Sequence, residues 1–202
     1  MPTTSQRSQS ISSDRSRLRA LGISQRNALC AHKRTTFSHR ACSHIAHYLE
    51  QMIGDCSHTI LAGYWPIHSE IDPRPLFDFV SSRGGHVALP AIIDETTMVF
   101  RTFASTTQLE LMRFNTFGPS ANNAVVAPTV IIVPLCAFDN QCHRLGYGAG
   151  YYDRAIEHLQ KHGHRAHLWG LSFSCQEVES ISKRKHDLVL QKIFTEKGFI
   201  EC

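Results

Sequence analysis

The sequence predicts an α/β protein with three layers, in which helices flank a mostly parallel central sheet. Short apolar segments that are typical of buried strands alternate with longer segments of helical periodicity. One apolar segment, residues 130–136, leads into a glycine-rich turn and then a helical pattern from residue 151. No internal repeat is visible. Because folds of this kind bind ligands at the carboxyl ends of their strands, the loops after the apolar segments are the first places to look for a site.

The composition is that of a soluble globular domain. Of the 202 residues, 42% are hydrophobic and 19% are charged, which is unlike a disordered chain. Residues 1–13 are rich in Ser, Thr and Gln and almost free of apolar side chains. We therefore expect a disordered tail over 1–13 and one domain over 14–202.

Several classes of function are disfavoured. The longest apolar stretch, residues 125–138, contains two prolines and is too short to cross a bilayer, and no secretory signal begins the chain. The net charge is only +4 and the basic residues are dispersed, which disfavours nucleic acid as a partner. We expect a cytoplasmic protein, a monomer, without membrane partners.

Cysteine and histidine give no metal motif. The seven cysteines are an odd number and contain no C-x-x-C pair, so we expect reduced thiols. His158 and His162 are four residues apart but lack the glutamate of a zinc-protease helix, so a transition-metal site is not favoured there.

The first predicted helix starts at Ser13 and Asp14, which can cap it. Arg15 and Arg19 are four residues apart and share one face of this helix. From the residues alone, a solvated basic face is the plainer explanation of that spacing, and a ligand role is the alternative. A second helix, over about residues 36–52, has a regular apolar stripe and implies no chemistry.

The middle of the chain is predicted to supply a buried strand over residues 60–65, a loop over 66–72 and a helix over 73–83. The loop carries Glu70, whose carboxylate can accept hydrogen bonds from a ligand, although an exposed loop carboxylate is the plainer interpretation. The remaining predictions are strands at 87–90, 98–103, 130–136, 167–171 and 188–195, a helical turn at 108–112, and a short helix at 174–178.

The stretch richest in chemistry is residues 144–154, Arg-Leu-Gly-Tyr-Gly-Ala-Gly-Tyr-Tyr-Asp-Arg. Its glycines allow the backbone to approach a ligand, and the helix that follows offers free N–H groups to phosphate oxygens. The turn matches neither the Walker A pattern nor the dinucleotide fingerprint, and glycine-rich turns also serve as tight connections. The flanking arginine, tyrosines and aspartate favour a cradle for a triphosphate, a flat heterocycle and Mg²⁺.

This stretch resembles the signature of the 5-formyltetrahydrofolate cyclo-ligases, also called methenyltetrahydrofolate synthetases. The similarity extends upstream over residues 133–139, with an apolar strand, a proline and a Phe-Asp pair. Residues 15–19 match the family's basic-x-x-Leu-Arg element, Glu70 matches its pterin-binding glutamate, and residues 186–187 match its late His-Asp pair. The resemblance covers nearly the whole chain from residue 15 to about residue 198.

The resemblance implies an enzyme that uses ATP to convert 5-formyltetrahydrofolate to 5,10-methenyltetrahydrofolate, with release of ADP and phosphate. It implies catalytic roles for Arg144 and Tyr152, and Mg²⁺ held by Asp153 and Asp187. The implied ATP-binding residues are Arg15, Arg19, Arg144, Leu145, Gly146, Tyr147, Gly148, Ala149, Gly150, Tyr151 and Tyr152. The implied folate-binding residues are Trp65, Glu70, Phe117, Tyr147, Gly148, Ala149, Gly150 and Tyr151.

The chain departs from the family pattern in two places. Ala121 and Asn122 stand where the family usually has Glu-Pro, and Gln191 replaces an aspartate. These departures keep open a non-catalytic relative that binds folate or nucleotide without turnover. A nucleic-acid module that uses the arginines and tyrosines, and an NAD-type Rossmann enzyme, are further alternatives.

Overall fold

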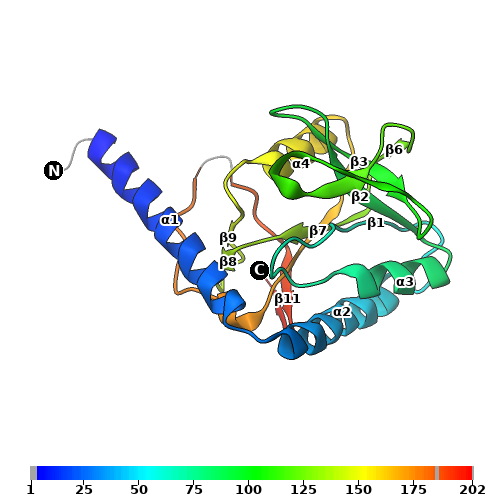
Figure 1. Ribbon diagram of the computed structural model, residues 1–202, viewed down its shortest axis with the longest axis horizontal. Helices are drawn as coiled ribbons and strands as arrows, with labels where there is room; N and C mark the ends of the chain where they lie inside the picture. The colour runs from blue at the N-terminus through cyan, green and yellow to red at the C-terminus, as the bar shows by residue number, and fades with distance from the viewer. Residues whose placement is uncertain (1–3, 185–186, 202) are drawn as a thin grey trace.

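The computed structural model describes residues 4–184 and 187–201, and only the backbone of residues 4–12. An eight-stranded sheet lies at its centre, in the order β12-β11-β10-β7-β1-β2-β3-β6 (Figure 1). The strands from β11 to β2 in this order run parallel, whereas β12, β3 and β6 are antiparallel to their neighbours. The strands are β1 (Ile60–Ala62), β2 (His86–Ile92), β3 (Met98–Phe103), β6 (Val125–Val126), β7 (Val130–Pro134), β10 (His167–Leu171), β11 (Lys192–Thr195) and β12 (Gly198–Glu201).

Helices cover both faces of this sheet. Helices α2 (Ala31–Ile53) and α3 (Arg74–Ser82) lie on one face, and α4 (Tyr151–Lys161) lies on the other (Figure 1). Successive side chains of β7 point to opposite faces of the sheet: Ile132 packs in the hydrophobic cluster under α2 and α3, and Ile131 packs in the cluster under α4. The predicted architecture, a mostly parallel sheet flanked by helices, is confirmed.

Helix α1 (Thr4–Asn27) belongs to neither layer. It packs against the hairpin of β8 (Ala137–Phe138) and β9 (Arg144–Leu145), which follows the carboxyl end of β7, and against the 3-10 turn η2 (Ser174–Gln176), which follows β10. Leu18 is buried there among Ala137 and Leu145. The N-terminal half of α1 projects from the body of the molecule (Figure 1). The helix therefore crosses the edge of the sheet at which the sequence predicts the ligand site.

Two helix starts differ from the prediction. Helix α1 begins at Thr4, so residues 4–13, which we expected to be disordered, are helical. No glycine or proline interrupts the chain between Thr4 and Leu21, and serine and glutamine are tolerated in a helix that packing holds further on. Helix α2 begins at Ala31 with Cys30 as its N-cap residue, and not near residue 36.

Other elements also differ. Residues 108–112, predicted as a helical turn, contain strand β4 (Leu109–Leu111), which pairs with β5 (Phe117–Pro119) around the 3-10 turn η1 (Arg113–Asn115). Strand β5, the partner of β4, lies outside residues 108–112, from which the helical turn was predicted. The strands predicted at 60–65, 130–136 and 188–195 are shorter, the helix at 174–178 is the single turn η2, and strand β12 was not predicted.

Five of the six described cysteines carry free thiols, as expected. Cys142 is disulfide-bonded, which the sequence did not lead us to expect, because cysteine pairing depends on proximity in the fold and not on spacing.

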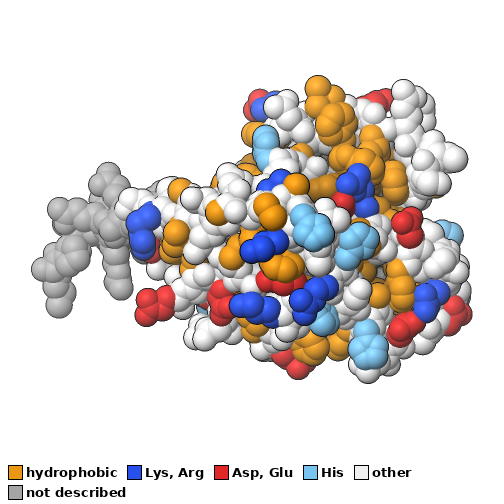
Figure 2. Space-filling view, turned by 60° about the horizontal axis from the view of Figure 1, so that its bottom comes forward, with side chains coloured by type: hydrophobic (Ala, Val, Ile, Leu, Met, Phe, Trp, Pro, Cys, Tyr) orange, Lys and Arg blue, Asp and Glu red, His pale blue; other side chains and the backbone are white. Residues whose placement is uncertain are grey.

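Within the part of the chain that the structure describes, none of the helices combines the length and the apolar character needed to cross a membrane. On the face shown in Figure 2, basic side chains lie among acidic, histidine and hydrophobic ones and form no continuous block.

Candidate functional site

The glycine-rich loop, residues 146–150, joins β9 to the start of α4. Gly148 and Gly150 have φ angles of +106° and +71°, which side chains other than glycine rarely adopt. Gly150 is the residue before the first turn of α4, so the first N–H groups of that helix face the end of the loop. The backbone thus has the form expected of an anion-binding turn.

Helix α1 supplies Arg19 to this loop. The Nε of Arg19 donates a hydrogen bond to the carbonyl oxygen of Gly146 at 2.8 Å. A Cβ atom at Gly148 would lie 3.7 Å from the Arg19 guanidinium, so the loop and the arginine are in close contact. Burial and the neighbouring charge of Arg15 both lower the pKa of Arg19. The lowered pKa indicates a positive electrostatic potential around Arg19, which a bound anion would reduce.

Arg15, one turn earlier on α1, forms a two-bond ion pair with Asp187. The two donor nitrogens of Arg15 lie 2.6 and 3.0 Å from the carboxylate oxygens, and one also donates to the Ser182 carbonyl at 2.8 Å. The hydrogen bonds from Arg15 and from the Arg184 backbone N–H outweigh burial and lower the pKa of Asp187. His186, the other member of the His-Asp pair, lies outside the described residues.

Arg144 and Asp153 form a second ion pair across the glycine-rich loop. The Arg144 side chain donates to Asp153 Oδ1 at 3.1 Å and to the Leu188 carbonyl at 2.8 Å. The same Asp153 oxygen accepts the Leu188 N–H at 3.1 Å. Because Leu188 follows Asp187 in the chain, this hydrogen bond holds the segment that carries Asp187 next to Asp153 on α4.

The two tyrosines at the start of α4 face different surroundings. Tyr151 donates to the Asp94 carbonyl at 3.0 Å, and its ring lies 6.0 Å from that of Phe114. The Tyr152 hydroxyl is buried and has no hydrogen-bond partner among the described residues. Burial and the charge of Glu70 raise the pKa of Tyr152, while Arg144 lowers it, so this hydroxyl stays protonated and lies close to both halves of the site.

The loop over residues 66–72 supplies Glu70, and Trp65 lies immediately before it. Glu70 Oε2 accepts the Ile67 N–H at 2.9 Å, and Trp65 packs on Phe103 and under the guanidinium of Arg74. Burial raises the pKa of Glu70 above its usual value, although hydrogen bonds and neighbouring positive charge oppose this rise.

Arg26 is a site residue that the sequence analysis missed. Its side chain is 2% exposed, and it donates to the Tyr147 hydroxyl at 2.6 Å and to the Ser69 hydroxyl at 2.9 Å. It therefore connects the glycine-rich loop to the loop that carries Glu70. A signal existed, because Arg26 is eleven residues after Arg15, which is close to three full helical turns and places both on one face.

Phe117 lies apart from this cluster. It is 41% exposed on β5, and no hydrogen bond, ion pair or ring contact found among the described residues joins it to the other candidate residues. The structure thus brings Arg15, Arg19, Arg144, Asp153 and Asp187 to one end of the sheet, with Glu70 and Tyr147 beside them, but it does not place Phe117 with them.

The donor set at Asp153 and Asp187 fits Mg²⁺. Carboxylates are hard oxygen ligands, and Mg²⁺ typically takes one or two of them together with phosphate oxygens and water. No group of three or more His, Cys, Asp or Glu residues suited to a metal occurs in the described ranges.

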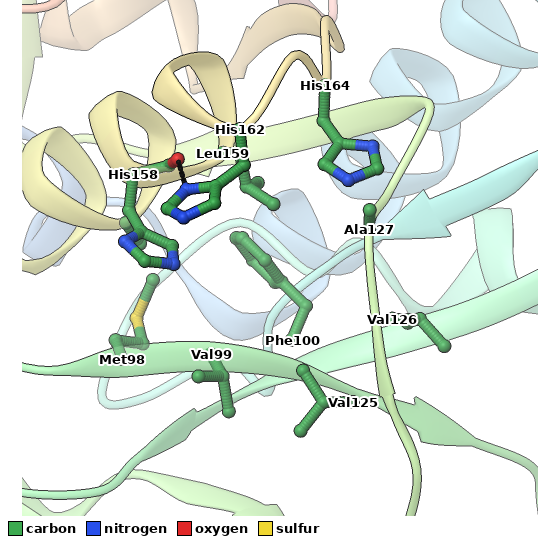
Figure 3. Close-up of a pocket in the computed structure, with 11 residues that line it drawn as sticks. Met98, Val99, Phe100, Val125, Val126, Ala127, His158, Leu159, His162 and His164 are labelled. Carbon is green, nitrogen blue, oxygen red and sulfur yellow. Dashed lines mark hydrogen bonds between the residues drawn. The ribbon is translucent and has the colours of Figure 1, made fainter.

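A separate cavity of about 300 Å³ lies between α4 and strands β3 and β6 (Figure 3). Its floor is apolar, with Met98 and Phe100, and His158, His162 and His164 stand at its rim. The rings of His158 and His162 lie 4.2 Å apart, and His162 Nδ1 bonds to the His158 carbonyl. This cavity involves none of the residues that the sequence analysis assigned to a ligand.

The chain is similar to known proteins in both sequence and fold. The chain is 28% identical to the 5-formyltetrahydrofolate cyclo-ligase of Escherichia coli over 145 residues, which cover 69% of this chain and 78% of the relative. The fold matches a 5,10-methenyltetrahydrofolate synthetase from Aquifex aeolicus with a TM-score of 0.73 and 26% identity, covering 93% and 92% of the two chains. It also matches one from Mycoplasma pneumoniae with a TM-score of 0.72 and 20% identity, covering 91% and 99%. The sequence pattern of the 5-formyltetrahydrofolate cyclo-ligase family spans residues 11–196, and the chain belongs to that family.

Proposed function

We propose that this chain catalyses the ATP-dependent cyclisation of 5-formyltetrahydrofolate to 5,10-methenyltetrahydrofolate, with release of ADP and phosphate. Family membership supports the reaction class. The observation that carries the proposal is that helix α1 brings two arginines to the glycine-rich end of the sheet: Arg19 binds the Gly146 carbonyl of the loop, and Arg15 binds Asp187 from a distant part of the chain. That arrangement suits a polyanion such as the ATP triphosphate.

The reaction needs ATP because an amide oxygen is a poor leaving group. In the first step the formyl oxygen bonds to the γ-phosphorus, and the bond from that phosphorus to the β-phosphate oxygen breaks to release ADP. In the second step N10 attacks the formyl carbon and loses its proton, and the carbon–oxygen bond breaks. The oxygen and the proton leave with phosphate, so no protein nucleophile is required. The enzyme must align the two substrates and stabilise negative charge as it spreads over the phosphoryl group.

Arg15, Arg19 and Arg144 are the residues to which we assign the stabilisation of that charge. Two of them are nearly fully buried, where electrostatic interactions are stronger than in water. When bound, Mg²⁺ would neutralise charge on the phosphates, and Asp153 and Asp187 are the residues that would hold it. Tyr152 contributes a neutral hydroxyl as a donor to a substrate oxygen.

Glu70 is the residue to which we assign recognition of the pterin. Its ionised carboxylate can accept two hydrogen bonds, from the 2-amino group and from a ring N–H. Trp65 and Tyr147 supply aromatic surface beside it. Phe117 would join the folate site only if β4 and β5 approached the loop over residues 66–72.

An absorbance assay tests the proposal. The purified chain is mixed with 5-formyltetrahydrofolate, ATP and Mg²⁺, and the methenyl product is followed by its absorbance. We expect product only when ATP is present, with one ADP formed for each methenyl group. Folate binding without ATP-dependent product would instead support the non-catalytic relative, and the proposal would be wrong.

A further inference from the structure

Arg26 occupies an unusual position for a charged side chain. It lies near the end of α1 and is only 2% exposed, yet none of the ion pairs among the described residues includes it. Its side-chain hydrogen bonds among the described residues go to neutral groups: Nη2 donates to the Tyr147 hydroxyl at 2.6 Å, and Nε donates to the Ser69 hydroxyl at 2.9 Å. Burying a guanidinium without a directly paired carboxylate costs stability. Such a cost is more typical of a functional site than of a structural one.

The contacts of Arg26 reach both halves of the site. Tyr147 is part of the glycine-rich loop, and the Arg26 guanidinium lies 5.8 Å from the centre of its ring. Ser69 precedes Glu70 in the other loop, and its hydroxyl also contacts the Asn27 side chain of α1. These loops are far apart in the sequence, and Arg26 is hydrogen-bonded to both.

We propose that Arg26 is a positioning residue for the cyclisation proposed above: by holding Tyr147 and the Ser69–Glu70 segment in one arrangement, it makes the nucleotide loop and the folate loop a single site. The inference rests on the proposed function, because it assigns Tyr147 and Glu70 to the substrates. We assign Arg26 no contact with substrate, because its hydrogen bonds go to Tyr147 and Ser69, and it acts through these two neighbours.

The charge of Arg26 has a second consequence, for Glu70. Burial raises the pKa of Glu70, and the Ile67 N–H, Arg26, Tyr147 and His68 oppose the rise. Only the ionised carboxylate can accept both pterin hydrogen bonds. Removing the positive charge must therefore raise the pKa of Glu70 further. As the solution is acidified, folate binding by such a variant must weaken at a higher pH than it does in the wild type. The ionisable groups that face Glu70 from all sides are Arg26, Tyr64, His68, Cys136, Tyr147 and Tyr152.

Two substitutions of Arg26 separate position from charge. Arg26→Gln removes both, so we expect a KM for folate at least about tenfold higher, and an acid limb of the kcat/KM profile shifted to higher pH. Arg26→Lys keeps the charge but cannot reproduce the two donors of the guanidinium. We expect it to raise KM while leaving the acid limb where it is in the wild type. Arg83→Gln, which removes an arginine from a surface ion pair with Glu50, is the matched control and should change neither quantity.

Tyr147→Phe is the second test, because it removes the acceptor of Arg26 without removing a charge. We expect a higher KM for folate. Because the Tyr147 hydroxyl also lowers the pKa of Glu70, we expect the acid limb to move to higher pH, but by less than in Arg26→Gln. Thermal melting shows whether each variant is folded. If Arg26→Gln and Tyr147→Phe both bind folate as the wild type does, the inference is overturned.

The two failures are distinguishable. A wild-type chain that forms no ATP-dependent product overturns the proposed function alone. The role of Arg26 in joining the loops is then decided by folate binding, measured by quenching of Trp65 fluorescence, since the other tryptophan, Trp169, is buried. Weaker binding by Arg26→Gln supports the inference, and unchanged binding overturns it.

Discussion

Each carboxylate that we assign to Mg²⁺ is paired with an arginine that we assign to phosphate. Arg15 holds Asp187, and Arg144 holds Asp153. If the carboxylates hold Mg²⁺ and the guanidiniums hold phosphate oxygens, as we propose, both pairs would exchange partners when a metal–nucleotide complex binds. The Nε atoms of Arg15 and Arg144 are buried and have no hydrogen-bond partner in the described part of the chain. Unsatisfied buried donors are rare, and a phosphate oxygen would satisfy them.

Arg144→Gln tests this interpretation at the level of one residue. Because we assign to this guanidinium the stabilisation of charge that develops during phosphoryl transfer, we expect kcat to fall by about 10²–10³, the range typical for loss of one preorganised donor. Arg144→Lys retains a charge without the planar guanidinium, and its kcat should lie between those of the wild type and Arg144→Gln. The measurement is steady-state kinetics with both substrates saturating.

The folding of these variants must be checked together with their kinetics, because Arg144 is 7% exposed and also donates a hydrogen bond to the Leu188 carbonyl. Thermal melting of both variants gives that control. A folded Arg144→Gln variant with wild-type kcat would remove this residue from the catalytic assignment.

Asp94 makes a separate prediction about stability in acid. The N–H of Thr96, followed by contacts with Thr97, lowers the pKa of Asp94 to about 2. In the unfolded chain the pKa is about 3.9. The ionised carboxylate therefore contributes stability that is fully present above about pH 4 and is lost as the pH falls towards 2. Asp94→Asn should reduce the slope of unfolding free energy against pH in that window.

Urea unfolding between pH 2 and pH 5 measures the slope. Asp187 also has a lowered pKa, so the variant should retain part of the acid dependence. An Asp94→Asn slope equal to that of the wild type would contradict the prediction.

At the scale of elements, α1 is the element that assembles the part of the candidate site that we assign to the nucleotide. It supplies Arg15 and Arg19, and at Gly22 it lies against the chain that follows β7. A Cβ atom at Gly22 would lie 2.1 Å from the Cys136 carbonyl oxygen, a backbone atom that cannot move aside cheaply. Glycine in a helix normally lowers stability relative to alanine. Here it is required because only a glycine lets α1 dock.

Gly22→Ala should therefore be harmful, against the usual helix preference. We expect a lower melting temperature, with an overpacking cost of about 1–3 kcal/mol, and a higher KM for ATP because Arg19 moves away from Gly146 together with α1. Ala20→Gly is the matched control: Ala20 is exposed on the same helix. That change should lower the melting temperature without altering the KM for ATP. Equal effects of the two variants on KM would contradict the role given to Gly22.

The sequence predicted the elements whose signals are local. The stripe of Ala41, Ile45 and Leu49 identified α2, and the alternation of buried strands and helices identified the architecture. It did not predict β12, although Thr195 pairs with Gly198 across a two-residue turn. Hairpins that depend on a partner elsewhere, such as β4 with β5, carry too weak a signal in either strand alone.

The same distinction holds for the site. The glycine-rich loop was found because its residues are contiguous and its composition is unusual. Arg26 was missed because its partners, Ser69 and Tyr147, come from two other parts of the chain. The pairing of Arg15 with Asp187 was not predicted either, since a contact across 172 positions leaves no trace in the spacing of either residue.

At the scale of the whole molecule, the site joins segments that no single layer holds together. Helix α1 comes from the start of the chain and Asp187 from near its end, while the two loops come from between them. A ligand that contacts all four segments must stabilise the folded state as a whole, because it binds the folded chain and not the unfolded one.

Ligand-dependent melting tests this. With an ATP analogue that resists hydrolysis, Mg²⁺ and folate, each at about a hundred times its Kd, each site adds about 2.7 kcal/mol, or roughly 5–10 °C in melting temperature for a chain of this size. Because Arg26 joins the two loops, we expect the shift with both ligands to exceed the sum of the separate shifts. Chelation of Mg²⁺ should reduce the nucleotide shift in the wild type but have little effect in Asp153→Asn, where a metal ligand is already lost. A nucleotide shift that is the same with and without Mg²⁺ would show that Asp153 and Asp187 hold no metal with the nucleotide.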